Sequence, residues 1–491
     1  MKGMNNLNCV TRLRESWKNK DGIFKRLFII CTILTICVLL SFWISSFALI
    51  TCIAASISFF FMKGGKKIYI LIYLVPFYNV LRLEPYSFVL CSIVLAVAIA
   101  LLGIEFLIEL IRKKKKIEYL HTMLFVALII YIMLPIGPYN IMYNLKLVST
   151  VAILYFVYIN RKDLNFKSLV YIWVVALLIS CLLSNLRVVS SRLEWILPDF
   201  SSNINNSKRF TGLTDDPNYF AIEIALLLSG LTQLYFSDQI GFVFYPLIFI
   251  LSLIGFLTLS KSYIIAYILY LSLMMFGFLL YRNMHKKCML KRIIYITVSI
   301  LLSITLCIPQ IKTTIGRFNN GFIEFNIENN INGEINSDLS NSDLSNSTLN
   351  AITTGRSEIW SAYLKAIFSS PNKFLFGHGT GASLPLEISA HNFYLEGLFL
   401  FGFVGCLLMI CIAVYLFIIL MRNHRLKFAN LLTLLIIALM LFSLNSLISY
   451  RMHALVILIS YSLGVQSEKN KKNKEEGEND AKSISDNECV Q

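Results

Sequence analysis

The sequence predicts an all-α protein, a polytopic bundle of transmembrane helices. Of its 491 residues, 57% are hydrophobic and only 15% are charged. Apolar runs recur from residue 27 to residue 466, and at roughly 18–20 residues each is long enough to cross a ~30 Å hydrocarbon core as a helix. Strands are excluded because an open sheet edge cannot satisfy its backbone polar groups in lipid.

The formal net charge of +16 is explained by membrane topology rather than by nucleic-acid binding. Lysine and arginine cluster in short loops at every second turn of the chain, as the positive-inside rule requires of cytoplasmic loops. We therefore expect no nucleic-acid partner. The basic N-terminal segment, residues 1–26, is expected in the cytoplasm, and the cell membrane is the predicted location.

The N-terminal membrane bundle is predicted over residues 27–185. Its first apolar run is too long for one crossing and breaks near "WISS" at 43–46, so we expect two helices there. The other spans of this bundle are expected near residues 68–83, 87–111, 117–135, 145–160 and 167–185. The last of them delivers the chain to the outside.

A polar outside loop over residues 186–217 leads to spans within 218–311, near 219–236, 240–258, 262–281 and 293–311. A larger outside loop, 312–390, precedes the C-terminal spans of 391–466, near 393–421, 429–449 and 452–466. A lysine-rich cytoplasmic tail, 467–491, follows. This gives about fourteen spans, with about twelve as the alternative count, and both termini are in the cytoplasm.

The larger outside loop contains two contrasting segments. "SDLSNSDLSNST" at 337–348 repeats a unit of Ser, Asn and Asp that cannot bury enough apolar surface to order itself, so the insert 334–348 is predicted to be flexible. In "GRSEIWSAYLKAIF", by contrast, apolar residues recur at helical spacing. This pattern predicts an amphipathic helix whose apolar stripe is Ile359, Trp360, Tyr363, Leu364 and Ile367.

Charged residues within the spans indicate where chemistry is located, because they are costly in lipid. Glu105, Glu109 and His121 are near inner helix ends, where they can reach the interface. Glu223 and Glu396 are expected about one turn inside the outer ends of their helices. No carboxylate cluster and no CxxC pair predicts a metal site, so we expect the chemistry to need no metal and no other cofactor, and to take place at the outer face.

Three outer stretches carry polar groups suited to chemistry: "KRFTGLTDDPNYF" with Arg209 and Asn218, "TTGRSEIW" with Arg356, and "GHGTGASLPLEISAHNFYLEG" with Gly377, Gly379, His391 and Asn392. Each has a plain structural interpretation by itself. Arg209 is then a surface charge, the glycines form a turn, and His391 is an interfacial histidine. An arginine at a helix start opposes the helix dipole, which favours an anion bound there.

Taken together and in this order, these motifs resemble the O-antigen polymerase and O-antigen ligase family, over roughly residues 205–420. The resemblance includes "TLSKS" at 258–262 and "HNFYLEGLFLFGFVG". It implies a membrane glycosyltransferase that acts on undecaprenyl-diphosphate-linked oligosaccharides in contact with membrane lipid. The family often has arginine where this chain has Lys261, which contacts phosphate as a point charge and not with two donors.

The resemblance assigns roles to individual residues. His391 would orient or deprotonate the acceptor hydroxyl, with Glu223 and Glu396 as the weaker candidates for that base. Arg209, Arg356, Lys261 and Arg317 would neutralise the departing diphosphate. Asn218, Gly377, Gly379 and Asn392 complete the expected substrate-binding set.

The sequence favours a polymerase of capsular or similar polysaccharide, which transfers a growing glycan to the next lipid-linked repeat unit. One alternative is a ligase that transfers glycan to a lipid or protein acceptor. Another is a flippase or transporter of lipid-linked oligosaccharide, which predicts a polar central cavity that the sequence does not indicate. A flippase and a chain-length regulator are the expected protein partners.

Overall fold

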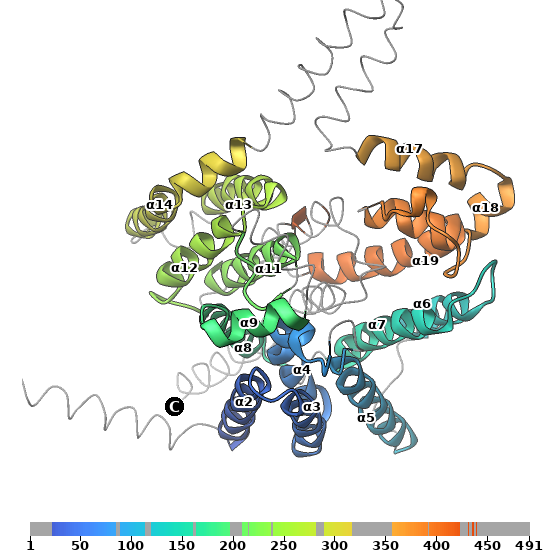
Figure 1. Ribbon diagram of the computed structural model, residues 1–491, viewed down its shortest axis with the longest axis horizontal. Helices are drawn as coiled ribbons and strands as arrows, with labels where there is room; N and C mark the ends of the chain where they lie inside the picture. Colours follow the sequence, from blue (N-terminus) through green and yellow to red (C-terminus); the bar gives the residue numbers. More distant parts are fainter. Residues whose placement is uncertain are drawn as a thin grey trace, which may run out of the picture.

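The computed structural model describes residues 22–84, 89–112, 119–160, 164–196, 209–214, 216–236, 239–280, 289–316, 356–390 and 392–422, and positions 431, 435, 436 and 438. All regular structure in these ranges is helical, without a strand (Figure 1). Five of these helices are long and apolar enough to cross a membrane, or six if a bent pair is counted as one span. The predicted all-α bundle is confirmed, whereas the count of about fourteen spans stays a prediction. The last two predicted spans fall almost entirely outside the described residues.

The first apolar run forms two antiparallel helices, α2 (Gly22–Ser41) and α3 (Ser46–Ser58), with the break at the predicted position. The next predicted span, 68–83, is not one regular α-helix. After two short 3-10 helices, η1 (Phe59–Phe61) and η2 (Gly64–Lys67), the chain forms α4 (Ile68–Leu74) and then the 3-10 helix η3 (Val75–Val80). Pro76 explains the change, since it has no N–H to donate and its ring clashes with the preceding turn.

Four further helices complete the N-terminal part: α5 (Cys91–Ile111), α6 (Tyr119–Met133), α7 (Ile141–Ile159) and α8 (Phe166–Ser184). Asn140 and Asn165 begin α7 and α8 by accepting a backbone N–H with their side chains, at 3.0 Å in each case. The polar stretch after α8 contains a helix that the sequence reasoning missed, α9 (Arg187–Ile196).

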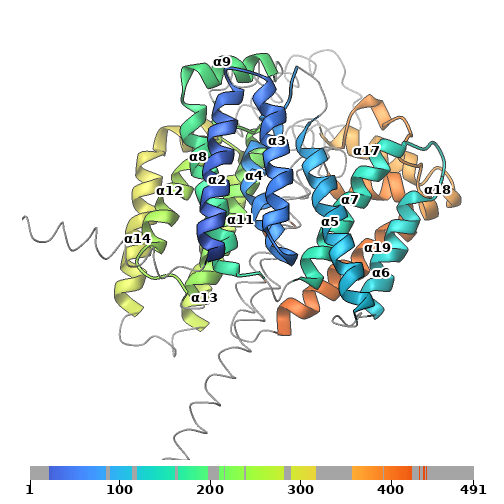
Figure 2. The same ribbon diagram turned by 90° about the horizontal axis from the view of Figure 1, so that it is seen from below.

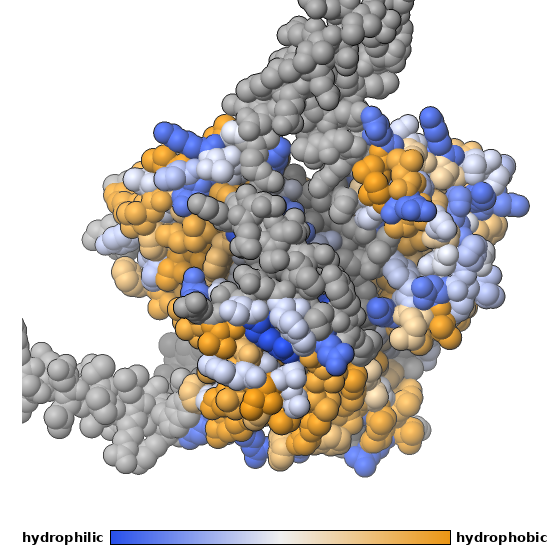
Figure 3. Space-filling model, viewed as in Figure 1, coloured by the Kyte–Doolittle hydropathy of each residue, from blue (hydrophilic) through white to orange (hydrophobic). Residues whose placement is uncertain are grey.

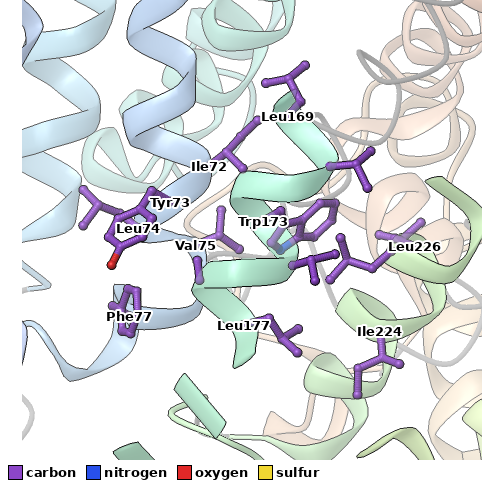
Figure 4. Packing of buried hydrophobic residues seen from close by; sticks show 14 of the residues in the cluster. Ile72, Tyr73, Leu74, Val75, Phe77, Leu169, Trp173, Leu177, Ile224 and Leu226 are labelled. Carbon is purple, nitrogen blue, oxygen red and sulfur yellow. The ribbon is translucent and has the colours of Figure 1, made fainter. Parts of the chain in front are cut away.

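Helix α11 (Pro217–Phe236) is the centre of the bundle, because all of its residues except Asn218 are buried. It packs against α8, α12 (Phe244–Leu257) and α13 (Lys261–Leu280). Helix α14 (Met289–Leu306) lies along α12 and continues after a 64° bend into residues 308–316. In Figure 4, Trp173 of α8 lies between the side chains of α4 and those of α11, and its ring is fully buried.

A second packing unit contains α17 (Arg356–Ile367), α18 (Pro371–Phe376) and α19 (Phe393–Arg422), which pack with one another and, through α19, on α6. The predicted amphipathic helix is confirmed as α17. Tyr363 and Ile367 are buried and Ile359 and Trp360 are half-buried, but Leu364 is 42% exposed, at the edge of the stripe. Figure 2 shows α9 and α17 toward the same end of the bundle.

The outer surface of the bundle is strongly apolar over wide areas (Figure 3). Large side chains at least 40% exposed follow one another along single helices, such as Phe28, Ile29, Ile33 and Ile36 on α2. A soluble monomer rarely exposes contiguous apolar surface of this extent. Together with the long apolar helices, this surface indicates a protein that spans the membrane.

Candidate functional site

The first polar cluster forms where the segment before α11 meets the turn between α12 and α13. The Arg209 guanidinium donates from Nε to the Thr258 carbonyl and from Nη2 to Asn218 Oδ1, both at 2.9 Å. The backbone N–H of Phe210 donates to the Leu257 carbonyl at 3.0 Å, which fixes the two segments side by side. Arg209 is therefore held in a defined position and is not a freely moving surface charge.

Asn218 connects these two segments through a single atom. Its Oδ1 accepts from Arg209 and also from Ser260 Oγ, again at 2.9 Å, while its backbone N–H donates to Asp216 Oδ1 at 2.6 Å. An aspartate side chain that accepts the N–H two residues later is a local turn, and it starts α11 together with Pro217. Lys261, directly after Ser260, is the first residue of α13.

The structure thus brings together three of the sequence-predicted residues, Arg209, Asn218 and Lys261. The turn that presents Lys261 is tight, because Leu259 adopts a φ of 50°. A non-glycine residue rarely occupies this region, and such strain clusters at functional sites. Sequence reasoning missed the contribution of Ser260 and Asp216, although both stand inside the motifs that were singled out.

Glu223 follows this cluster along α11 and is completely buried. Neither of its carboxylate oxygens has a hydrogen-bond partner among the described residues. The Trp173 indole lies near enough to interact with it electrostatically, but without good hydrogen-bond geometry. An isolated carboxylate is expensive to bury, and in a membrane protein such a residue is a functional candidate.

The second cluster surrounds position 391. Trp360 Nε1 of α17 donates to the Ala390 carbonyl at 2.9 Å, and the Tyr363 hydroxyl donates to the Ile388 carbonyl at 3.0 Å. On the other side, Asn392 caps α19, because its Oδ1 accepts from the N–H groups of Tyr394 and Leu395. The residues before His391 are therefore held by side chains of α17, and the residue after it by the start of α19, while His391 itself lies outside the described residues.

Glu396 lies one helical turn into α19 from Asn392 and is completely buried. Its Oε1 accepts from Ser389 Oγ at 2.5 Å, a short, charge-assisted contact. Tyr143 of α7 and Tyr363 of α17 are near enough for the Glu396 charge to act on both rings. Burial, with that charge as a second cause, raises the pKa of Tyr363, so its hydroxyl stays a proton donor.

The glycine-rich turn serves backbone packing. Gly377 and Gly379 have φ angles of 83° and 87°, and the N–H of Gly379 donates to the Leu400 carbonyl at 3.1 Å. A Cβ on Gly377 would meet the Gly402 nitrogen at 2.6 Å, where α19 is interrupted by a φ of 62°. The backbone N–H groups of both glycines already donate to backbone carbonyls. Neither N–H is available to a substrate, so the role of the two glycines in substrate binding stays a prediction.

Two predicted arginines have no described side chain. Arg356 is the first residue of α17, as expected, but only its backbone is described, and Arg317 lies outside the described residues. The repeat insert 334–348 also lies outside them. Within the described part of the chain, His, Cys, Asp and Glu side chains form no group of three that could hold a metal ion.

The chain matches no family model and no curated protein sequence. The two clusters around Arg209 and position 391 therefore carry the functional argument.

Proposed function

We propose that this protein is a polysaccharide polymerase at the outer face of the membrane. It would transfer a growing glycan from undecaprenyl diphosphate to the next lipid-linked repeat unit. The observation that carries the proposal is the Arg209–Asn218–Ser260 hydrogen-bond network. It fixes a cation against the turn that leads into Lys261, at a site built from two motifs that the resemblance to O-antigen polymerases and ligases singles out.

The proposal requires the two clusters to lie on one side of the membrane, and contacts between loops support this. With about fourteen spans, the helix connections fall alternately outside and inside. Connections assigned to the outside contact one another: Arg192 donates to the Leu83 carbonyl, and Gly381 donates to the Pro138 carbonyl. Connections assigned to the inside do so as well, because Gly65 packs against Asn160, and Lys67 of the same connection pairs with Glu105 in α5.

The proposed chemistry is a glycosyl transfer. The acceptor hydroxyl oxygen attacks the anomeric carbon of the donor, and the bond from that carbon to the diphosphate oxygen breaks. The electron pair leaves with undecaprenyl diphosphate, whose charge Arg209, Lys261 and Arg356 would neutralise. His391 would accept the hydroxyl proton, and the Glu396 carboxylate would stabilise the imidazolium that results.

The ligase alternative uses the same donor chemistry and differs only in the acceptor. The flippase alternative requires no bond to be made. A half-buried arginine held by two hydrogen bonds is suited to a fixed reaction centre, since preorganised charge stabilises a transition state without reorganisation.

The test is carried out in cells that make the polymer. Replacing the chain by the variant His391→Ala is expected to cause undecaprenyl-linked single repeat units to accumulate outside while long polysaccharide disappears. His391→Gln separates positioning from proton transfer, because glutamine forms a hydrogen bond but takes up no proton. Long polymer from normally expressed His391→Ala protein contradicts the proposal.

A further inference from the structure

A second pair of arginines, Arg82 and Arg192, stands at the outer ends of the N-terminal helices, apart from the motifs discussed above. Arg82 follows η3 and is only 8% exposed. Arg192 lies in α9, and its Nη2 donates to the carbonyl of Leu83, the residue after Arg82, at 3.3 Å. The two guanidinium groups are thus carried by backbone segments in direct contact.

Both guanidinium groups are left incompletely paired. The Nε atoms of Arg82 and Arg192 are buried and have no hydrogen-bond acceptor in the described part of the chain. Among the side chains that the structure describes, no carboxylate forms an ion pair with either of them. Both groups keep their charge, because an arginine remains protonated at any ordinary pH.

The orientation of Arg192 suits an anion. Its guanidinium carbon lies 3.7 Å from the centroid of the Trp195 ring, so its face is stacked on the indole. Stacking uses the face of the guanidinium and leaves the in-plane N–H groups for other acceptors. In Figure 3, strongly hydrophilic surface interrupts the apolar exterior close to the position of α9.

A buried cation with unused hydrogen-bond donors is unfavourable unless an anion neutralises it. Two guanidinium groups on contacting segments provide several planar N–H donors, which match the oxygens of a phosphate. We propose that Arg82 and Arg192 bind a phosphate group of a membrane lipid at the outer face. This inference extends the proposed function and rests on it for the identity of the lipid, undecaprenyl diphosphate. A polymerase handles two lipid diphosphates, and this pair would hold the one that is not at Arg209.

Full-length protein purified in detergent tests the binding directly. Undecaprenyl diphosphate is titrated in one arm and phosphatidylglycerol in the other, and bound lipid is measured by native mass spectrometry. We expect Arg192→Gln and Arg82→Gln to weaken binding by about tenfold or more. Lys373→Gln, which removes an exposed cation on α18, is the matched control and should leave binding unchanged.

Each outcome decides the proposal. Weaker binding of undecaprenyl diphosphate alone assigns the site to the substrate lipid, and weaker binding of phosphatidylglycerol as well assigns it to lipid phosphate in general. Unchanged affinity for both lipids in Arg192→Gln, or an equal loss in Lys373→Gln, overturns it. Arg192 is half-exposed, so its variant stays informative if Arg82→Gln fails to fold. His391→Ala should retain this binding even though it abolishes transfer, so a failure of the catalytic proposal is recognised separately.

Discussion

Arg209 and Asn218 are joined by a 2.9 Å hydrogen bond from the guanidinium Nη2 to the side-chain amide oxygen. The same oxygen accepts from Ser260 of the α12–α13 turn, so this amide, together with the Thr258 carbonyl, holds the cation in place. Phosphate-binding cations must be positioned before the reaction for their charge to lower its barrier.

Removing that amide should therefore reduce activity without unfolding the protein. We expect Asn218→Ala to lower the transfer rate roughly 10- to 100-fold, because Arg209 and Ser260 each lose a partner worth about 1–3 kcal/mol. The rate is measured as lipid-linked glycan lengthened per unit of protein. Asn372→Ala, an exposed asparagine of α18, should match wild type. Wild-type rates in Asn218→Ala would remove the network from the mechanism.

The charge of Glu396 is predicted to matter more than its shape. Glu396→Gln retains the volume and a hydrogen-bonding oxygen for Ser389 but cannot stabilise an imidazolium at His391. Its turnover number should fall by about 10²–10⁴, the range of a lost general acid–base function. The exposed Glu387 provides the control variant Glu387→Gln. Equal turnover numbers for Glu396→Gln and Glu387→Gln would show that Glu396 has only a packing role.

The glycine-rich turn should respond in stability rather than in chemistry. Gly377→Ala introduces a Cβ against the Leu400 carbonyl at a φ of 83°, and strain of this kind is unfavourable by about 1–3 kcal/mol. The midpoint of thermal unfolding should fall. Gly241→Ala is the control, since a Cβ there meets nothing within 4 Å. A stable Gly377→Ala protein that has lost activity would instead favour the substrate-binding interpretation.

His378 gives a pH dependence whose sign follows from its surroundings. Burial lowers its pKa, although its Nε2 lies 3.0 Å from the Ala366 carbonyl. The unfolded chain, with a pKa near 6.5, then takes up a proton at a higher pH than the folded protein. The stability this ring contributes is present above about pH 6.5 and is lost as the pH falls below it.

The wild-type unfolding midpoint should therefore decrease between pH 7.5 and pH 5.5 by more than that of His378→Gln. Scanning calorimetry on protein in nanodiscs compares the two. Parallel decreases would show that other groups control the acid sensitivity.

The features of the fold that could be predicted from the sequence are those that depend on the local pattern of residues. The break between α2 and α3, the helix at 356–367 and the beginning of α19 near Asn392 follow from apolar periodicity and capping residues. That Arg209, Asn218 and Lys261 belong to one site could be predicted only because the resemblance had grouped their motifs. The contact of Arg192 with Leu83 could not be predicted from the sequence, because it joins two segments that lie far apart in the chain and no local pattern indicates that they meet.

The glycines show a different limit. A glycine-rich turn that binds phosphate and one that allows two backbones to approach closely have the same residue pattern. Only the partner segment distinguishes them, and here the partner of Gly377 is the interruption of α19 at Gly402.

The most direct measurement reconstitutes the purified full-length protein in liposomes that contain an undecaprenyl-diphosphate-linked repeat unit. The account predicts that glycan chains lengthen and that one undecaprenyl diphosphate is released for each glycosidic bond formed, in wild type but not in His391→Ala. Movement of the intact lipid-linked unit across the bilayer, with no bond formed and no undecaprenyl diphosphate released, would contradict it.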